Sequence, residues 1–169
     1  MYSFTDKTVL VLTRGGSFDK IYPEGKGTYE FVFPKKSAVY EIIERMRLTN
    51  IRVHSMNPMD SLDMDVSDYR ATARQCITEP EERQVIVHGT DGIIEVASRI
   101  TQHDLPKTIV VTGSSLPACV RGSDADTNFA GAICAVRILP YGVYIHMHGR
   151  TFRWDECEKN DLGQFVPLP

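Results

Sequence analysis

Hydrophobic runs and helical periods alternate along the whole chain. Short runs of apolar, β-branched residues predict strands, and apolar positions that recur every three or four residues predict the helices between them. The predicted strands cover residues 7–13, 51–56, 84–88, 108–112 and 142–146, and the predicted helices cover 37–47, 67–78, 93–100 and about 123–137. We also expect a short hairpin partner at 151–154 and a small hairpin at 29–33.

Strands that alternate with helices favour one fold class. A strand followed by a helix and another strand typically forms a parallel pair with a right-handed crossover. We therefore expect an α/β protein: a three-layer α/β/α, flavodoxin-like domain with a mainly parallel sheet. The 169 residues contain no internal repeat and no low-complexity segment, which predicts a single domain over residues 1–169.

Composition and charge narrow the classes of partner. Hydrophobic residues make up 42% of the chain and charged residues 24%, which are ordinary values for a globular protein. The net charge of −3 gives no basic surface for nucleic acid or an anionic membrane. The apolar runs are far shorter than the roughly 18 residues of a membrane span. The N-terminus does not resemble a signal peptide, and the four cysteines have no paired spacing. We expect a cytoplasmic protein that binds neither nucleic acid nor membrane.

Polar and glycine residues follow the predicted strands. Ligands of parallel sheets bind beyond the carboxyl ends of the strands. Glycines there let backbone amides approach a ligand, and hydroxyl groups can hold or attack it. This pattern predicts a site for a small polar molecule. The segments that reach this edge are Arg14–Ser17, Met59–Ser61, His88–Asp91, Gly113–Ser115 and His148–Gly149.

These motifs resemble a known family. His88–Asp91, with the sequence HGTD after a strand, and the Gly15-Gly16 turn are similar to those of the bacterial-type L-asparaginases. The later segment Ile109–Gly113, Ser123-Asp124 and Asn128 extend the likeness, which runs in order from Val9 to about Gly163. It is closest to short, single-domain members. We therefore expect an asparaginase-like N-terminal domain without the C-terminal asparaginase domain.

The resemblance implies an amidohydrolase. Such an enzyme hydrolyses a side-chain carboxamide, that of L-asparagine or a related amide, to a carboxylate and ammonia through a hydroxyl nucleophile. Ser17 and Thr90 stand at the two nucleophile positions, and Asp91 and Lys159 complete a relay with Thr90. A lysine acts as a base only if its environment favours the neutral amine.

The resemblance also implies substrate-binding residues. Ser61, preceded by Asp60, matches the residue that holds the substrate's α-carboxylate. Tyr29 corresponds to the tyrosine of the mobile loop, with Tyr22 as the second choice. Backbone N–H groups are candidate donors to an oxyanion. The candidate donors are the N–H groups of Gly89-Thr90 and Gly113-Ser114. Gly16 would let the substrate approach the backbone closely.

No cofactor or metal is expected. His146 and His148 alternate along a predicted strand and would face the same side, but a third ligand is not in view. Relatives of this type assemble, so the resemblance implies a homo-oligomer.

Departures from the family pattern leave a second hypothesis open. Arg14 places a cation beside Ser17 where the family usually has threonine, and Gly92 replaces a hydroxyl residue. We also expect the second domain to be absent. In full-length members this domain supplies a substrate-binding carboxylate to the neighbouring subunit. The alternative is a catalytically inactive domain that serves as a binding or structural component of a larger assembly.

Weaker hypotheses also remain. A nucleotide- or flavin-binding domain has less support, because the first strand is followed by neither GxGxxG nor a P-loop. Taken alone, Thr90-Asp91 would fit an ordinary helix N-cap better than a catalytic pair, and it is the presence of Ser17, Ser61 and Lys159 that favours the site.

Overall fold

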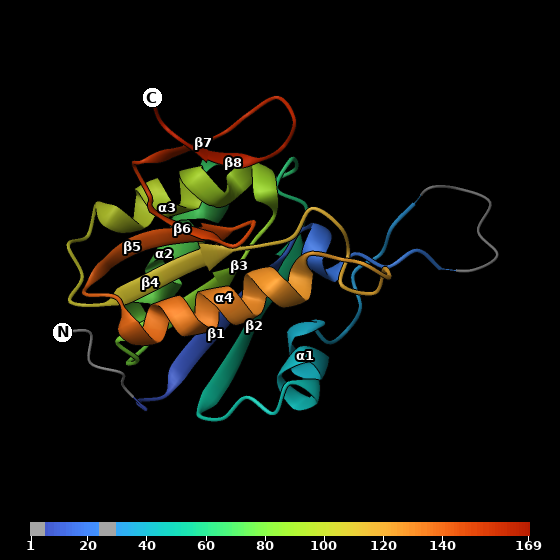
Figure 1. Ribbon diagram of the computed structural model, residues 1–169, viewed down its shortest axis with the longest axis horizontal. Helices are drawn as coiled ribbons and strands as arrows, with labels where there is room; N and C mark the ends of the chain where they lie inside the picture. The colour runs from blue at the N-terminus through green and yellow to red at the C-terminus, as the bar shows by residue number, and fades with distance from the viewer. Residues whose placement is uncertain (1–5, 24–29) are drawn as a thin grey trace.

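A six-stranded sheet forms the centre of the computed structural model, which describes residues 6–23 and 30–169 (Figure 1). The strand order is β2-β1-β3-β4-β5-β6, and the neighbours from β2 to β5 are parallel whereas β6 is antiparallel to β5. The predicted mainly parallel α/β fold is therefore confirmed. The strands are β1 Val9–Gly15, β2 Ile51–Met59, β3 Arg83–Val87, β4 Thr108–Thr112, β5 Gly142–Met147 and β6 Arg150–Arg153.

Helices cover both faces of the sheet. Helices α1 (Val39–Arg45) and α4 (Ala125–Ile138) pack on one face, and α2 (Val66–Thr78) and α3 (Ile93–Thr101) pack on the other. Two short 3-10 helices, η1 (Ser17–Asp19) and η2 (Thr90–Gly92), follow β1 and β3. No helix in the described part of the chain is long and apolar enough to span a membrane.

The strands are apolar on both sides because both faces are covered. Val9 and Val11 of β1 belong to the core with α1 and α4, whereas Leu10 and Leu12 belong to the core with α2 and α3. Successive strand residues point to opposite faces, so a continuous apolar run fills both cores. This is why the buried strands were the easiest elements to predict.

Element boundaries differ where turns and caps decide them. Strand β2 runs to Met59, because its pairing with β1 shifts register between Thr13 and Gly15. Helix α2 begins at Val66, one residue before the predicted start, and is capped by Asp65: the Asp65 carboxylate accepts the amide of Asp68, whose side chain accepts the amide of Asp65. The predicted partner at 151–154 is confirmed as β6.

One small hairpin was not predicted at all. Strand β7 (Cys157–Lys159) pairs antiparallel with β8 (Phe165–Pro167), and the hairpin lies beside α3 (Figure 1). The hairpin predicted at 29–33 begins at a residue outside the described range, and in the described part Ile21 and Val32 form an isolated antiparallel bridge.

Candidate active site

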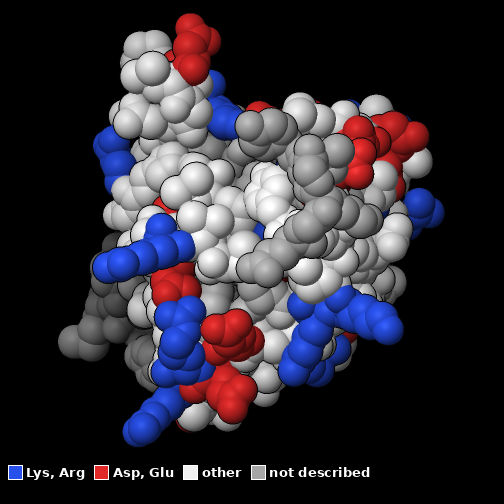
Figure 2. All heavy atoms as spheres, turned by 90° about the vertical axis from the view of Figure 1, so that its right-hand side faces the viewer, with Lys and Arg blue, Asp and Glu red and all other residues white. Residues whose placement is uncertain are grey.

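The glycine turns after β1 and β3 are in direct backbone contact. Gly16 has a φ of +72°, and a Cβ there would lie 2.3 Å from the Cα of Gly89. Only glycine satisfies both the backbone conformation and this approach. Ser17 and Thr90, the residues that follow, are thereby brought to the same edge of the sheet. Figure 2 looks onto this edge, where side chains of both charges occur.

Thr90, Asp91 and Lys159 form one contact group. The Nζ atom of Lys159 donates to Thr90 Oγ1 at 3.0 Å and to Asp91 Oδ1 at 2.6 Å. The lysine side chain is 24% exposed, so it is partly shielded by the protein. Residues 69 positions apart therefore meet as the relay hypothesis requires.

The β7–β8 hairpin carries the lysine. Lys159 is paired with Phe165 across the hairpin, and both Phe165 and Cys157 are buried in the core with α2 and α3. The Asn160 side chain accepts the amide of Gln164 and closes the turn. The hairpin is thus anchored by apolar side chains while its lysine reaches Thr90.

Ser61 lies against the β3 turn. A Cβ on Gly89 would come within 2.5 Å of Ser61 Oγ, and the Tyr69 hydroxyl donates to the Ser61 carbonyl at 3.3 Å. Ser61 is buried. The structure therefore places Ser61 beside Gly89, the residue that precedes Thr90.

The carboxylate of Asp60 is already bound by donors of the protein itself. Its carboxylate forms an ion pair with Lys20 and accepts the amide of Leu62. Partial burial acts to raise the pKa of Asp60, but these donors hold it below its ordinary value. The Lys20 ammonium also lies 4.0 Å from the ring centroid of Phe31. Asp60 therefore ties the loop before Ser61 to the segment after Ser17.

His88 is fully buried beside these residues. Its Nδ1 lies 3.0 Å from the carbonyl oxygen of Gly89. Burial, helped by the charge of Arg14, lowers the pKa of His88 to about 4. The ring is therefore neutral at pH 7 and supports the turn before Thr90.

Residues 8–165 match the family model described as "Asparaginase, N-terminal". The chain belongs to the asparaginase family. Escherichia coli (strain K12) L-asparaginase 1 is 27% identical to this chain over 137 residues. The match covers 78% of this chain and 40% of that protein.

Solved asparaginases share this fold. The thermostable L-asparaginase from Thermococcus kodakarensis has a TM-score of 0.80 at 22% identity, covering 95% of this chain and 51% of that one. L-asparaginase I from Vibrio cholerae O1 biovar eltor has a TM-score of 0.78 at 22% identity, covering 96% and 52%. The chain thus spans about half the length of the asparaginases whose structures it matches.

Arg14 departs from the asparaginase pattern, and its cation is paired with a carboxylate. The side chain is 5% exposed and donates to Asp68 Oδ1 at 2.8 Å and to the Asn57 carbonyl at 2.5 Å. The Arg14 guanidinium is therefore an ion-paired cation, held by Asp68 at the start of α2. Arg14 joins the two ends of the segment that carries Ser61.

The second departure, Gly92, has a steric cause. A Cβ at Gly92 would lie 2.5 Å from Cε1 of His88 and 2.9 Å from Cε1 of Tyr69. A hydroxyl residue at this position would displace the stacked rings. Glycine at position 92 therefore follows from the buried histidine and tyrosine, and does not argue against a working site.

The loop after β4 completes the edge. Gly113 approaches β3 so closely that a Cβ would lie 2.3 Å from the His88 carbonyl oxygen. Ser114 is fully buried and its hydroxyl donates to the Leu116 carbonyl at 2.7 Å, so this hydroxyl maintains the loop. The role of the Ser114 backbone N–H stays a prediction.

Two residues that carried the resemblance hold this loop. The Asp124 carboxylate accepts the amide of Ser115 at 2.9 Å. Asn128 donates to the Gly113 carbonyl at 3.0 Å and to Asp124 at 2.9 Å. Their helical spacing was visible in the sequence, but their positioning role was not.

Other predicted residues lie elsewhere. Tyr29 falls outside the described residues, and the alternative, Tyr22, is 53% exposed. The two histidines do not share a side: His146 packs against Gly131 of α4, whereas the ring of His148 lies against Phe165. This prediction is wrong because His148 lies beyond β5 in a turn. Among the described residues, no group of three or more His, Cys, Asp and Glu side chains is arranged to hold a metal ion.

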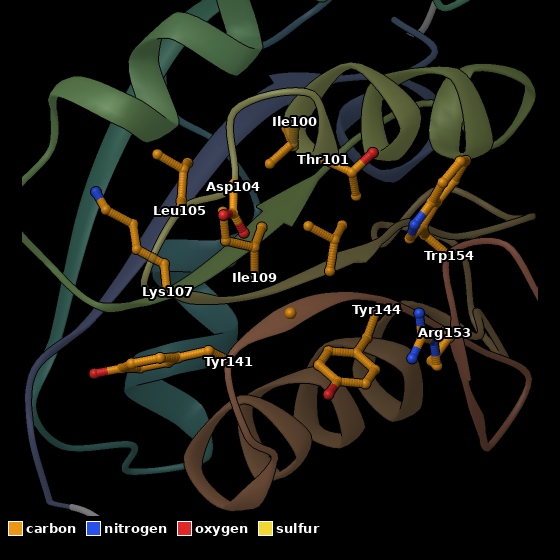
Figure 3. A pocket seen from close by; sticks show the side chains of 12 residues that line it. Ile100, Thr101, Asp104, Leu105, Lys107, Ile109, Tyr141, Tyr144, Arg153 and Trp154 are labelled. Carbon is orange, nitrogen blue, oxygen red and sulfur yellow. The ribbon is translucent and has the colours of Figure 1, made fainter.

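A separate cavity of about 270 Å³ opens at the amino ends of β4 and β5 (Figure 3). It is lined by Trp154, Tyr144 and residues at the end of α3. Lys107, also in its lining, donates to the Cys76 carbonyl at 2.7 Å, so its ammonium caps the end of α2. This cavity lies at the opposite edge of the sheet from Thr90.

Proposed function

We propose that this chain carries the active-site residues of an asparaginase-like amidohydrolase. Its substrate is a side-chain carboxamide, L-asparagine or a related amide, and its products are a carboxylate and ammonia. The observation that carries the proposal is the contact of Lys159 with both Thr90 and Asp91. A hydroxyl, an amine and a carboxylate in this order make an activated nucleophile.

In this mechanism Thr90 is the activated hydroxyl. The Lys159 amine takes the hydroxyl proton as Thr90 Oγ1 attacks the amide carbon, and Asp91 balances the ammonium that forms. The C–N bond then breaks as the amide nitrogen takes this proton from Lys159 and leaves as ammonia. Water hydrolyses the resulting ester and restores Thr90. Ser17 is the second hydroxyl at the site.

Substrate recognition follows from the surrounding residues. The Ser61 hydroxyl, beside Gly89, is placed to receive the α-carboxylate of the substrate. Backbone N–H groups of Gly89-Thr90 and Gly113-Ser114 are the proposed oxyanion donors, since a tetrahedral intermediate places negative charge on its oxygen. These groups follow the carboxyl ends of β2, β3 and β4.

Assembly into a homo-oligomer is part of the proposal. Leu62 and Leu162, which follow Ser61 and Lys159 in the chain, are 76% and 81% exposed. Contact with a second copy would remove this apolar surface from water, which favours association. Light scattering of the purified protein measures the molar mass; a monomer at every concentration would contradict this part.

The test of the activity is ammonia release from L-asparagine and L-glutamine. We expect wild type to be active and Thr90→Ala to lose activity by about 100-fold or more. Thr127→Ala, an exposed threonine of α4, is the matched control and should retain activity. Ser17→Ala shows whether the second hydroxyl is needed. A folded wild type that releases ammonia from neither amide would refute the proposal for these substrates.

A further inference from the structure

His148 occupies a strained turn position. It has a φ of +53° and is followed by Gly149 at +73°, between the paired residues Met147 and Arg150. Positive φ at both central residues is the hairpin turn for which Asn-Gly is preferred. A residue other than glycine is uncommon at positive φ, although histidine is one of those that occur there most, and the conformation persists where the surrounding structure fixes it. The contacts of the imidazole explain why this position is held.

The histidine contacts several elements that build the site. Its backbone N–H donates to Asn128 Oδ1 at 3.0 Å. Its Nδ1 accepts the amide N–H of Phe165 at 3.4 Å, and its ring centroid lies 6.1 Å from that of Phe165. Its Nε2 lies 3.4 Å from Ser115 Oγ. One side chain therefore joins the β5–β6 turn, the loop after β4 and strand β8.

These contacts determine the tautomer. Because Nδ1 accepts a backbone N–H, the proton of the neutral ring is on Nε2, which donates toward Ser115. An Nε2 that carries the proton is no base for the serine hydroxyl. His148 and Ser115 are therefore a structural contact rather than a second nucleophile–base pair.

The contact between His148 and Phe165 lies beside a surface cavity. A cavity of about 400 Å³ lies between the β7–β8 turn and the β5–β6 turn, lined on one side by Leu162 and Gly163 and on the other by His148 and Arg150. The hairpin is thus poorly packed at this end. The imidazole bridges the gap at Phe165, the residue paired with Lys159.

We propose that His148 is a positioning residue that holds the β7–β8 hairpin so that Lys159 contacts Thr90. It acts through Phe165 and touches none of the proposed reacting groups. The effect on catalysis rests on the proposed function, whereas the effect on the hairpin does not.

The test is His148→Gly. Glycine suits a turn with positive φ, so the variant should fold and melt near the wild-type temperature. It has no side-chain acceptor for the Phe165 amide, so hydrogen exchange at Phe165 and in the hairpin should be about 10-fold faster, with β4 unchanged. Because the lysine is less well placed, kcat should fall about 10-fold while KM changes less than about twofold. The control is His103→Gly, which replaces an exposed histidine after α3.

The outcomes separate the two proposals. Unchanged exchange in the hairpin, or faster exchange with an unchanged kcat, would overturn the positioning role. Faster exchange in His148→Gly with no ammonia release from wild type would support the anchoring of the hairpin and refute the amidohydrolase proposal for the two tested amides. A rise in KM alone would also contradict the proposal, because Lys159 is placed for the chemical step rather than for binding.

Discussion

The phenol ring of Tyr69 stacks on the imidazole of His88, with ring centroids 5.8 Å apart and planes 27° from parallel. The stack connects α2 to the turn after β3, because the Tyr69 hydroxyl reaches the Ser61 carbonyl and the His88 ring lies against the Gly89 carbonyl. An uncharged imidazole is therefore part of the support beneath the site, and its protonation has an energetic cost.

Stability should fall in mild acid because of His88. Burial lowers its pKa to about 4 in the folded protein, against about 6.5 in the unfolded chain. Between these values the unfolded chain binds more protons, so stability is complete above pH 6.5 and is lost as pH falls toward 4. We expect a loss of about 2 to 3 kcal/mol between pH 7 and 4.5 from this group, measured by denaturant unfolding.

His88→Gln isolates this contribution. The variant is expected to be less stable at pH 7 but to show a correspondingly smaller difference between the two pH values. Replacing the exposed His103 should leave the difference as it is in wild type. If His88→Gln kept the full pH dependence, a neutral buried imidazole would be excluded.

Gly16→Ala should disrupt the contact between the two turns. Alanine is unfavourable at the positive φ of this position, and its methyl group would collide with the Gly89 backbone. We therefore expect the free energy of unfolding to fall by more than about 2 kcal/mol and most of the activity to be lost. Gly122→Ala is a matched control: its φ is +82°, but a Cβ there has no neighbour within 4 Å. Thermal melts compare the two variants: Gly122→Ala reports the cost of the backbone strain alone, and Gly16→Ala reports the strain together with the collision. Equal losses would show that the turns can move apart.

Breaking the Arg14–Asp68 pair should cost more than breaking a surface pair. Arg14→Met leaves a partly buried carboxylate, and we expect about 3 kcal/mol of destabilisation. Arg45→Met breaks the exposed pair with Asp126, where the side chains are 51% and 37% exposed, and should cost less than about 1 kcal/mol. Urea unfolding measures both. Similar costs would mean that burial does not strengthen the Arg14 contact.

Lys159→Met should abolish activity without unfolding the protein. The amine is partly exposed and its hairpin is held by other residues, so we expect a melting temperature within a few degrees of wild type. Loss of the base should lower kcat by about 100-fold or more. Asp91→Asn should lower kcat less, because the amine remains. Lys35→Met, an exposed lysine, is the control, and retained ammonia release by Lys159→Met would remove lysine from the mechanism.

The sequence predicted the sheet well because burial and local pattern agree there. Strand β4 was predicted with its observed limits, since Thr108–Thr112 is apolar, β-branched and followed by glycine. The start of α2 was predicted one residue late, at Ser67 instead of Val66, because the exact first residue depends on a reciprocal contact between Asp65 and Asp68. Local pattern fixes an element more reliably than its ends.

The site was harder to predict than the fold. The contact of Lys159 with Thr90 was expected only through resemblance, because the strand that carries the lysine, Cys157–Lys159, is too short to show a period. The pairing of Arg14 with Asp68 had no local signal either, because the two residues meet only when β1 and α2 pack. Long-range contacts of single side chains need the folded backbone.

The floor of the proposed site is built from backbone alone. Gly16, Gly89 and Gly113 each lack room for even one methyl group. Laboratory evolution toward a different amide therefore cannot reshape the site at these glycines. New preferences must arise at the rim, at positions such as Leu62 and Ser115, where side chains can change size without separating the strands.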